Sequence, residues 1–284
     1  MDEFTATADL RRWVRTQRCR GRRIGLVPTM GFLHQGHLAL VDEARRRADV
    51  VVMSVFVNPL QFGPREDLSR YPRDLAGDRE LAAARGVDAL FAPADATMYP
   101  PGSEIRVVPG PSADRWEGAA RPGHFTGVLT IVAKLFHLIE PDVACFGRKD
   151  IQQLTLLRQM VRDLNWGLDL AVTPTVREPD GLALSSRNAY LTPDQRPRAT
   201  ALYAALGAAL ELWRGGETRA AAIEARMQAT LAAHAAVALE YIAIAEPTAL
   251  APVDRVDGSS VVALAARIGP VRLIDNVILG EGLP

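Results

Sequence analysis

The stretch that decides the fold runs from residue 24 to residue 57 and reads IGLVPTMGFLHQGHLALVDEARRRADVVVMSVFV. It opens with the apolar run Ile24–Val27, which Pro28–Gly31 interrupts. Apolar residues then recur at helical spacing, at Leu38, Val41, Ala44 and Ala48. The run Val50–Val57 is nearly continuous and rich in β-branched residues, as is typical of a parallel strand covered on both faces. The stretch therefore predicts a βαβ unit.

Helices and strands continue to alternate through the first part of the chain. The predicted helices are Asp74–Arg85, Thr126–Ile139 and Ile151–Leu164, and the predicted strands are Asp88–Phe91, Val143–Phe146 and Leu168–Val172. Such alternation is typical of an α/β protein with a Rossmann-like, doubly wound parallel sheet.

The pattern changes after Val176. Thr192–Gln195 combines an N-cap threonine, a proline and a glutamine, which predicts a helix start. The elements expected from there are an Ala-rich helix to Trp213, a second from Thr218 to Ala235, and the strands Leu239–Ala245, Val261–Ile268 and Val271–Leu279. We therefore expect a first domain, Rossmann-like, over residues 1–175 that binds its ligands at the strand ends. A smaller α+β domain over residues 176–284 would form a lid over the active site.

Composition narrows the class of protein. The 284 residues are 48% hydrophobic, and 33 basic residues balance 33 acidic ones, which argues against disorder and against a nucleic-acid binder. The acidic opening Met1–Phe4 lacks a secretory-signal pattern, and no apolar run reaches the ~18 residues of a membrane-spanning helix. We expect a cytoplasmic protein without membrane or nucleic-acid partners. Only Lys134 and Lys149 are lysines. For Lys134, which lies in an apolar helical stretch, chance is the preferred explanation, whereas Lys149 is a candidate for a role that a compact ammonium serves better than a guanidinium.

The segment after the first predicted strand carries two histidines. His34 and His37 lie where a parallel sheet places its ligands and where the N–H groups of a helix start favour anions. Imidazoles can donate to phosphate oxygens, and Gly31 and Gly36 allow close approach. We expect phosphate contact, with surface or metal-binding histidines as the alternative. No His-Glu-x-x-His pattern supports zinc.

Three further segments fall near strand ends or the domain junction. Lys149 follows a strand and precedes Asp150, a candidate helix cap, and its ammonium would neutralise phosphate, although a solvated charge is the alternative. Ser185–Asn188 offers hydroxyls beside an arginine for an oxyanion, or forms an ordinary polar turn. Gln61 could orient a hydroxyl or carboxylate. Asp78 could bind Mg²⁺, although acidic residues near helix starts are common in any case.

Several motifs appear together in one order. They are Pro28–Gly31 with Leu33, His34, Gly36 and His37; Phe56–Pro59 with Gln61 and Phe62; Tyr71–Arg73; Arg121, Pro122, His124 and Phe125; Phe146, Gly147, Lys149, Asp150, Gln152 and Gln153; and Ser185–Asn188. Over essentially its whole length the chain resembles the pantothenate synthetase family, within the wider nucleotidylyltransferase superfamily that shares His-x-Gly-His. Neither Gly-x-Gly-x-x-Gly nor a P-loop motif occurs, which disfavours a dehydrogenase and a P-loop enzyme.

The resemblance implies condensation of (R)-pantoate with β-alanine at the expense of ATP, through pantoyl adenylate, in a Mg²⁺-dependent homodimer. The residues implied around ATP are Met30, Gly31, His34, Gly36, His37, Gly147, Lys149, Asp150, Val176, Leu184, Ser185, Ser186 and Arg187. The residues implied in catalysis are His34, His37, Lys149, Ser185, Ser186 and Arg187. His37 would donate a proton to the departing pyrophosphate. Gln61 and Gln153 would hold pantoate, and Gln61 would also contact β-alanine.

The chain departs from the family pattern at three positions. Gly77 stands where many relatives have a second acidic residue beside the one equivalent to Asp78, which weakens the case for a protein ligand to Mg²⁺. Leu184 replaces a common methionine with a side chain of similar volume. Arg148 replaces a usually acidic neighbour of Lys149. Another nucleotidylyltransferase of the superfamily, or a nucleotide-sensing module without catalysis, is the alternative function. The main interpretation requires Lys149, His34 and His37 to converge on one triphosphate.

Overall fold

The predicted βαβ unit forms the middle of a larger sheet. In the computed structural model, which describes residues 1–64, 66–234 and 236–284, strand β2 (Ile24–Thr29) pairs in parallel with β3 (Val50–Val55). Helix α2 (Gln35–Arg47) connects them and buries Val41 and Ala44 against the sheet. The apolar runs are buried because the strands have neighbours on both sides and helices over their faces.

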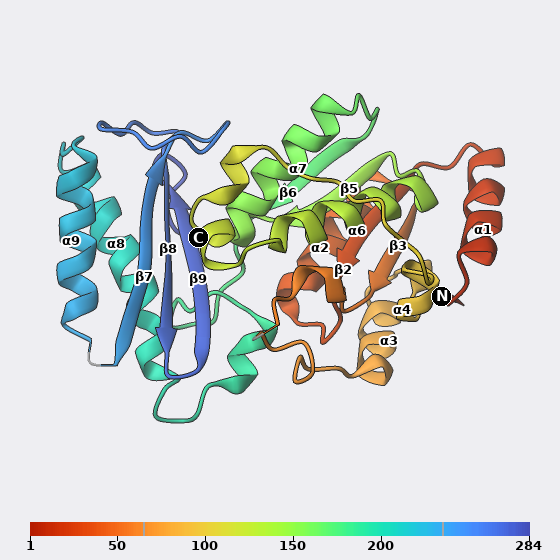
Figure 1. The fold of residues 1–284 in the computed structure, drawn as a ribbon, viewed down its shortest axis with the longest axis horizontal. Coiled ribbons are helices and arrows are strands. Elements are labelled where there is room, and N and C mark those ends of the chain that lie inside the picture. The colour runs from red at the N-terminus through yellow and green to blue at the C-terminus, as the bar shows by residue number, and fades with distance from the viewer. Residues whose placement is uncertain (65, 235) are drawn as a thin grey trace. The chain divides into compact units, whose positions relative to one another are not determined.

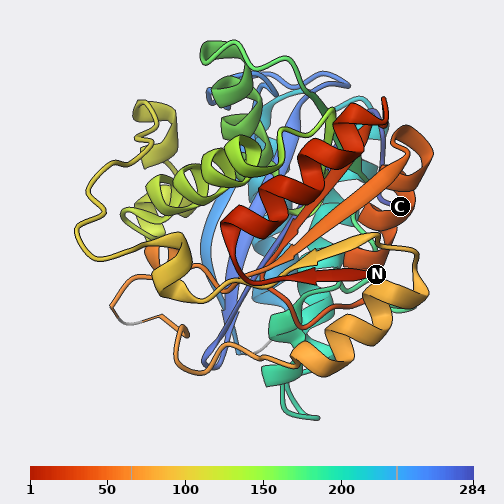
Figure 2. The ribbon, with the colours of Figure 1, turned by 90° about the vertical axis from the view of Figure 1, so that its right-hand side faces the viewer.

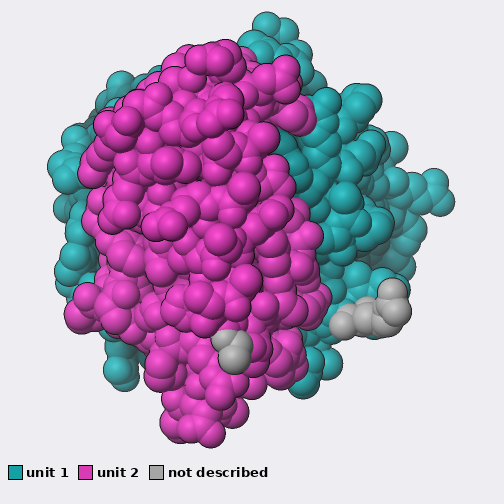
Figure 3. All heavy atoms as spheres, turned by 90° about the vertical axis from the view of Figure 1, so that its left-hand side faces the viewer, with its two compact units in different colours: residues 1–148, 156–173 teal, residues 149–155, 174–284 magenta. Residues whose placement is uncertain are grey.

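Contacts divide the chain into two compact units, which Figure 3 shows in different colours. Unit 1 consists of Met1–Arg148 and Leu156–Thr173, and unit 2 of Lys149–Thr155 and Pro174–Pro284. The short segment 149–155, which no pattern in the sequence sets apart, thus belongs with the C-terminal part of the chain.

Unit 1 contains a six-stranded sheet in the order β1-β4-β3-β2-β5-β6, and every neighbouring pair is parallel. The remaining strands are β1 (Asp2–Phe4), β4 (Ala89–Phe91), β5 (Val143–Gly147) and β6 (Asp169–Thr173). The strand order reverses beside β2, as the doubly wound prediction requires, and that prediction is confirmed (Figure 1). Sequence patterning missed β1, because three residues are too few to show a period.

Helices flank this sheet. They are α1 (Thr7–Cys19), α3 (Leu75–Ala84), α4 (Asp95–Met98), α5 (Glu117–Ala120), α6 (His124–Ile139) and α7 (Ile151–Asp163), which begins in unit 2. Helices α1 and α6 pack against each other (Figure 2). Cys145, expected in the core, is fully buried on β5. None of the helices within the described ranges combines the length and the apolar character that a bilayer crossing requires.

Unit 2 is built on an antiparallel sheet in the order β7-β8-β9. Its strands are β7 (Val237–Ala245), β8 (Val261–Ile268) and β9 (Val271–Ile278), and helices α8 (Ala201–Arg214) and α9 (Ala220–Ala232) cover one face (Figure 1). The turn between β8 and β9 uses Gly269 with a φ of 59°. This arrangement confirms the predicted smaller α+β part.

The predicted start of the first helix in unit 2 is wrong. The capping pattern at Thr192–Gln195 predicts a helix from there, but the α-helix begins at Ala201, after the 3-10 helix η5 (Pro197–Thr200). Thr192 and Gln195 do exchange hydrogen bonds, so the cap closes a single turn. Pro197 lacks the N–H that would continue an α-helix out of that turn. The predicted end of the second helix, Ala235, lies outside the described residues.

Candidate active site

The loop that follows β2 folds back sharply on itself. The Thr29 hydroxyl donates to the carbonyl of Ser54 at 2.7 Å and accepts from Gly31 N–H at 3.1 Å. Gly31 has a φ of 80°, and a Cβ there would lie 2.8 Å from a carboxylate oxygen of Asp78. Only glycine fits this position, because any side chain would meet that carboxylate in a strained backbone conformation.

Asp78, on α3, binds the backbone of the same loop through both of its carboxylate oxygens. Its Oδ2 accepts from Phe32 N–H at 2.9 Å, and its Oδ1 accepts from Leu33 N–H at 2.7 Å. The residue is 2% exposed. Burial raises the pKa of the Asp78 carboxyl above its ordinary value, although the two N–H groups act in the opposite direction. The carboxylate therefore anchors the loop that leads into the two histidines.

The surroundings of Asp78 do not fit the role of Mg²⁺ ligand predicted for it. Both of its oxygens already bind backbone N–H groups, and its neighbour Gly77 brings no carboxylate. Within the described ranges, no group of three or more His, Cys, Asp or Glu residues could hold a metal ion. Mg²⁺ usually binds one or two carboxylates together with phosphate oxygens and water, and at Asp78 it would have to compete with the two N–H groups for the same oxygens.

The two histidines begin α2. His34 is the N-cap, and its Nδ1 accepts from Gly36 N–H at 3.1 Å. His34 N–H in turn donates to Nδ1 of His37 at 3.3 Å, and the ring centroids lie 4.0 Å apart. Because each Nδ1 is an acceptor, a neutral ring carries its proton on Nε2. Both imidazoles therefore present an Nε2–H donor beside the N-terminus of α2, where anions are favoured.

Gln61 lies on the 3-10 helix η1 (Pro59–Gln61), directly after β3. Its Oε1 accepts from Nδ2 of Asn58 at 3.0 Å, and its Nε2 lies 3.0 Å from Sδ of Met30. Met30 and Gln61, both predicted site residues, are thus brought into contact from neighbouring strand ends. Gln61 is 8% exposed, so these two contacts and its burial hold the side-chain amide in one orientation.

His124 and Arg121 support Gln61 through its backbone. Nη1 of Arg121 lies 3.0 Å from Nε2 of His124, whose Nδ1 lies 2.9 Å from the carbonyl of Gln61. Burial, and then the charge of Arg121, lower the pKa of His124 to about 4, so the ring is neutral near pH 7. Arg121 donates to Nε2, and Nδ1–H donates to Gln61. Burial alone would raise the pKa of Glu66, but its ion pair with Arg121 lowers it.

Lys149 occupies the 3-10 helix η3 (Arg148–Asp150), which follows β5. Its carbonyl accepts from Nδ2 of Asn276 on β9 at 2.8 Å. Asp150 is exposed immediately before α7, and Gln153 is half-buried in the first turn of that helix. Within unit 2, Lys149 is therefore tied to β9, a strand more than 120 residues away in the sequence.

The serine–arginine segment follows a short hairpin. Arg177 and Ala183 form an antiparallel bridge, and Leu184 N–H donates to the carbonyl of Val176 at 2.9 Å. Ser185 caps the 3-10 helix η4 (Ser186–Tyr190) by accepting from Arg187 N–H at 3.3 Å. Val176 and Leu184, both predicted to flank the nucleotide, thus lie opposite each other at the base of the segment.

A buried ion pair that sequence reasoning missed supports this hairpin. Arg177 Nη1 and Nη2 contact Asp275 Oδ2 and Oδ1 at 2.7 and 3.0 Å, and the two side chains are 5% and 3% exposed. Asp275 also accepts from Asn276 N–H, and Asn276 binds the Lys149 carbonyl. One connected network thus links Lys149 to the hairpin before Ser185. No local pattern could have paired two residues 98 positions apart.

The predicted site residues fall into two groups, one in each unit. The unit 1 group consists of Met30, Gly31, His34, Gly36, His37, Gln61, Asp78 and Gly147, and the unit 2 group of Lys149, Asp150, Gln153, Val176, Leu184, Ser185, Ser186 and Arg187. Within unit 1 the contacts connect the residues from Met30 to His37 with Gln61 and Asp78. Within unit 2 they connect Lys149 with the hairpin that precedes Ser185.

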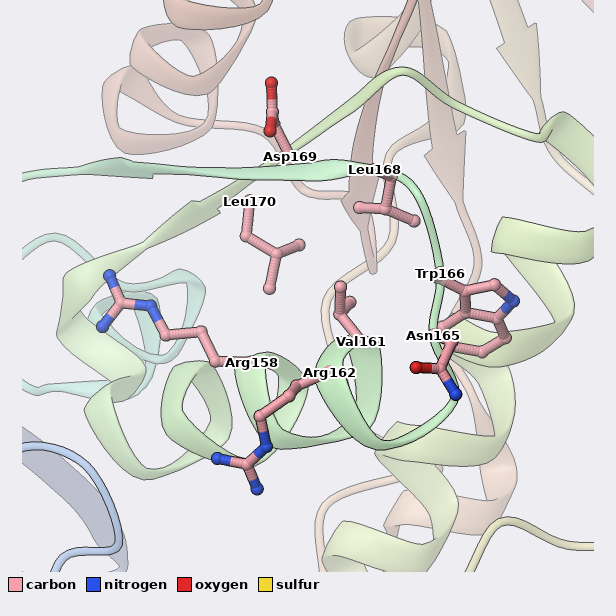
Figure 4. Close-up of a pocket in the computed structure, with 8 residues that line it drawn as sticks. All are labelled: Arg158, Val161, Arg162, Asn165, Trp166, Leu168, Asp169 and Leu170. Atoms are coloured by element: carbon pink, nitrogen blue, oxygen red, sulfur yellow. The ribbon is translucent and has the colours of Figure 1, made fainter.

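Two hollows in unit 1 differ in their relation to these residues. One, of about 200 Å³, lies at the carboxyl ends of the strands and is lined by Met30 and Asp78 together with charged residues such as Arg73. The other, of about 500 Å³, is open and lies where α7 ends and β6 begins, with Arg158, Arg162 and Trp166 around it (Figure 4). It contains none of the predicted site residues, so only the first belongs to the candidate site.

Comparisons with known proteins cover nearly the whole chain. The family model described as pantoate-beta-alanine ligase matches residues 2–278. The chain is 50% identical to the pantothenate synthetase of Moorella thermoacetica over 279 residues, covering 98% of this chain and 99% of that protein. It is 54% identical to that of Anaeromyxobacter dehalogenans over 263 residues, covering 90% and 91%.

Solved structures agree. The crystal structure of pantothenate synthetase from Thermus thermophilus is similar with a TM-score of 0.94 at 48% identity, covering 98% of this chain and 99% of that one. The pantoate-beta-alanine ligase from Francisella tularensis, complexed with β,γ ATP and β-alanine, is similar with a TM-score of 0.81 at 34% identity over the full length of both chains. The chain belongs to the pantoate–β-alanine ligase family.

Proposed function

We propose that this chain condenses (R)-pantoate with β-alanine, converting ATP to AMP and pyrophosphate and releasing pantothenate. The observation that carries the proposal is the pair of imidazoles, each with Nε2–H as its donor, at the start of α2 in a chain that matches the ligase family from residue 2 to residue 278. Donors fixed before the ligand arrives are what a reaction at phosphate requires.

The first step needs no nucleophile from the protein. A carboxylate oxygen of pantoate attacks the α-phosphorus of ATP, the bond from that phosphorus to the bridging oxygen breaks, and pyrophosphate leaves with the electron pair. His34 and His37 donate hydrogen bonds from Nε2–H to the phosphate oxygens and so stabilise the charge that develops on the leaving pyrophosphate. Full proton transfer from His37 would require its imidazolium form, because the neutral ring carries a single N–H. The product is pantoyl adenylate. Positioning and charge stabilisation supply the rate acceleration.

The second step forms the amide. The neutral amine of β-alanine attacks the acyl carbon of pantoyl adenylate, the bond from that carbon to the phosphate oxygen breaks, and AMP leaves with the electron pair while the amine nitrogen releases one proton to solvent. Gln61 and Gln153 hold the pantoyl group, and Gln61 also contacts β-alanine. The acyl phosphate is open to hydrolysis, so water must be kept out until the amine arrives. The lid role expected of residues 176–284 stays a prediction.

We propose ATP contacts for the unit 2 group as well. Lys149 neutralises phosphate charge, Ser185, Ser186 and Arg187 bind phosphate oxygens, and Val176 and Leu184 flank the adenine. Gly147 and Asp150 adjoin Lys149 and complete the nucleotide contacts. The network through Asn276 supports this assignment, because it fixes the backbone of Lys149 relative to the serine–arginine segment.

Mg²⁺ accompanies the nucleotide in this proposal and is held mainly by phosphate oxygens and water, since the surroundings of Asp78 do not fit a metal site. We further propose a homodimer in the cytoplasm.

The decisive experiment is a pantothenate-formation assay with each of pantoate, β-alanine, ATP and Mg²⁺ omitted in turn. Full activity should require all four, and AMP should form in equal amount with pantothenate. Exchange of labelled pyrophosphate into ATP should depend on pantoate but not on β-alanine. Exchange that depends on a different acid or nucleotide would favour another nucleotidylyltransferase. ATP binding with no turnover would favour a nucleotide sensor.

A further inference from the structure

The amide of Asn58 has only one possible orientation. Its Nδ2 lies 3.0 Å from the carbonyl of Gly127, which can only accept, and its Oδ1 lies 3.3 Å from Leu60 N–H, which can only donate. Asn58 is 1% exposed. Helix α6 comes close enough for the first bond because Gly127 has no side chain: a Cβ there would lie 2.3 Å from the Leu60 carbonyl.

This orientation passes to Gln61. Nδ2 of Asn58 carries a second hydrogen, and it points to Oε1 of Gln61 at 3.0 Å. The oxygen of the Gln61 amide is thereby engaged, and its Nε2 is turned the other way, to within 3.0 Å of Met30 Sδ. Sulfur is a weak acceptor, so this nitrogen keeps the capacity to bind a better one. Gln61 consequently offers donors to a ligand and withholds its acceptor.

Tyr99, which follows α4, completes the arrangement. Its hydroxyl lies 2.7 Å from Oδ1 of Asn58. Because that oxygen is an acceptor, the tyrosine must donate. Burial raises the pKa of Tyr99 well above its usual value, so the hydroxyl keeps its proton.

Two cations and an aromatic ring hold the Tyr99 ring. Nζ of Lys134 lies 5.6 Å from its centroid, Cζ of Arg106 lies 6.0 Å from it, and the Phe56 ring lies at 6.2 Å. Cations within about 6 Å of an aromatic face are attracted to it. Lys134, one of two lysines in the chain, thus contacts the residue that supports Asn58.

We propose that Tyr99 is a positioning residue for pantoate: through Asn58 it keeps Gln61 set to donate hydrogen bonds to a carboxylate or hydroxyl oxygen of that substrate. The inference rests on the proposed function, which assigns pantoate to Gln61. Without the tyrosine hydroxyl, Oδ1 of Asn58 keeps only its longer bond to Leu60, so the backbone groups alone orient the Asn58 amide and its Nδ2 holds Oε1 of Gln61 less firmly. The Gln61 amide is then freer to turn its oxygen towards an oxygen of the substrate, where two acceptors repel, and pantoate binding weakens.

The test compares Tyr99→Phe with wild-type enzyme in steady-state kinetics for each substrate. We expect the KM for pantoate to rise roughly three- to tenfold, as the loss of one hydrogen bond predicts, while the KM values for ATP and β-alanine stay within about twofold. Tyr203→Phe, which removes a tyrosine hydroxyl from unit 2, is the matched control and should change none of the three. Melting temperatures of both variants check the fold.

Lys134 gives a second, independent variant. Lys134→Met should raise the KM for pantoate less than Tyr99→Phe does, and Lys134→Arg should restore it, since the ring needs a cation rather than an ammonium. A general loss of kcat with unchanged KM for pantoate, or equal increases for all three substrates, would overturn the proposal. If wild-type enzyme shows no pantoate-dependent turnover, the proposed function fails instead, so the two failures are distinguishable.

Discussion

The histidine segment of unit 1 and the serine–arginine segment of unit 2 are built in opposite ways. His34 and His37 are oriented largely by hydrogen bonds to backbone groups within three residues of each other. The hairpin that carries Val176 and Leu184 into Ser185 is held by an ion pair between residues 98 positions apart. A local arrangement can be read from spacing in the sequence, whereas a distant one needs the whole of unit 2 to fold first.

The comparison implies different failures on mutation. Changing a histidine removes a reacting group but leaves the turn nearly intact, because neighbouring backbone groups remain in place. Changing a member of the buried pair leaves a charge without its partner in the interior and should destabilise the unit as a whole.

The largest effect is expected from the reacting groups. His37→Ala and Lys149→Ala should each lower kcat by at least about 100-fold, because each removes a hydrogen-bond donor or a charge that is proposed to stabilise the transition state. Far-ultraviolet circular dichroism and melting temperatures should match those of wild type. Near-normal turnover in either variant would remove that residue from the mechanism.

The buried pair gives the next largest effect, on stability. Asp275→Asn should lower the free energy of unfolding by about 3–5 kcal/mol in urea denaturation, because Arg177 keeps its charge without a carboxylate. The matched control is Asp180→Asn, which breaks the more exposed pair with Arg196 and should cost at most about 1 kcal/mol. Equal losses in the two variants would contradict the distinction drawn between local and buried support.

The stability of the protein in acid should depend on His124, whose buried ring is neutral near pH 7. The pKa of His124 is lowered from 6.5 to about 4 in the folded state, so between these values the unfolded chain binds the proton more readily. Stability is therefore expected to fall as pH drops from about 6.5 towards 4, by an amount on the order of 3 kcal/mol. His124→Gln should flatten this part of the pH–stability curve.

The control for that experiment is His137→Gln, which changes an exposed histidine on the same helix. It should leave the acid limb of the curve as in wild type. An unchanged slope in His124→Gln would show that other groups govern the acid response.

Asp78→Asn tests a support of the histidine segment that is distant in the sequence. Asp78→Asn replaces an acceptor with an amide N–H that faces a backbone N–H, so we expect a loss of about 1–3 kcal/mol in stability and a higher KM for ATP. The Mg²⁺ concentration that gives half-maximal activity should not change. A several-fold increase in that concentration would restore Asp78 as a metal ligand.

The smallest expected effect on stability comes from His34, the N-cap of α2. His34→Ala should lower stability by about 1 kcal/mol, because the first turn of α2 loses its side-chain acceptor. His34→Ser should recover most of that stability, since serine is a preferred N-cap, without recovering turnover. If serine restored turnover as well, His34 would act as a cap only.

Much of the fold followed from pattern. The run Val50–Val57 predicted a covered parallel strand, and the structure has β3 from Val50 to Val55. The helix predicted to start at Thr192 begins only at Ala201, because Pro197, five residues after Thr192, lacks the N–H that would continue an α-helix. For the site, the motifs and the family resemblance predicted roles for Met30, His37 and Gln61. The contacts among these segments were not predictable, since sequence patterns carry no distances.

By itself the sequence determined the alternation of helices and strands, the family and the residues with the chemistry for phosphate and carboxylate. These follow from periodicity and from residue types at fixed spacing, which act over a few neighbours. The tertiary structure alone decided that Asp78 binds the Phe32–Leu33 backbone, that Gln61 presents its nitrogen, and that Arg177 pairs with Asp275. Each of these depends on burial, where a polar group must find a partner wherever the fold brings one, however distant in the chain.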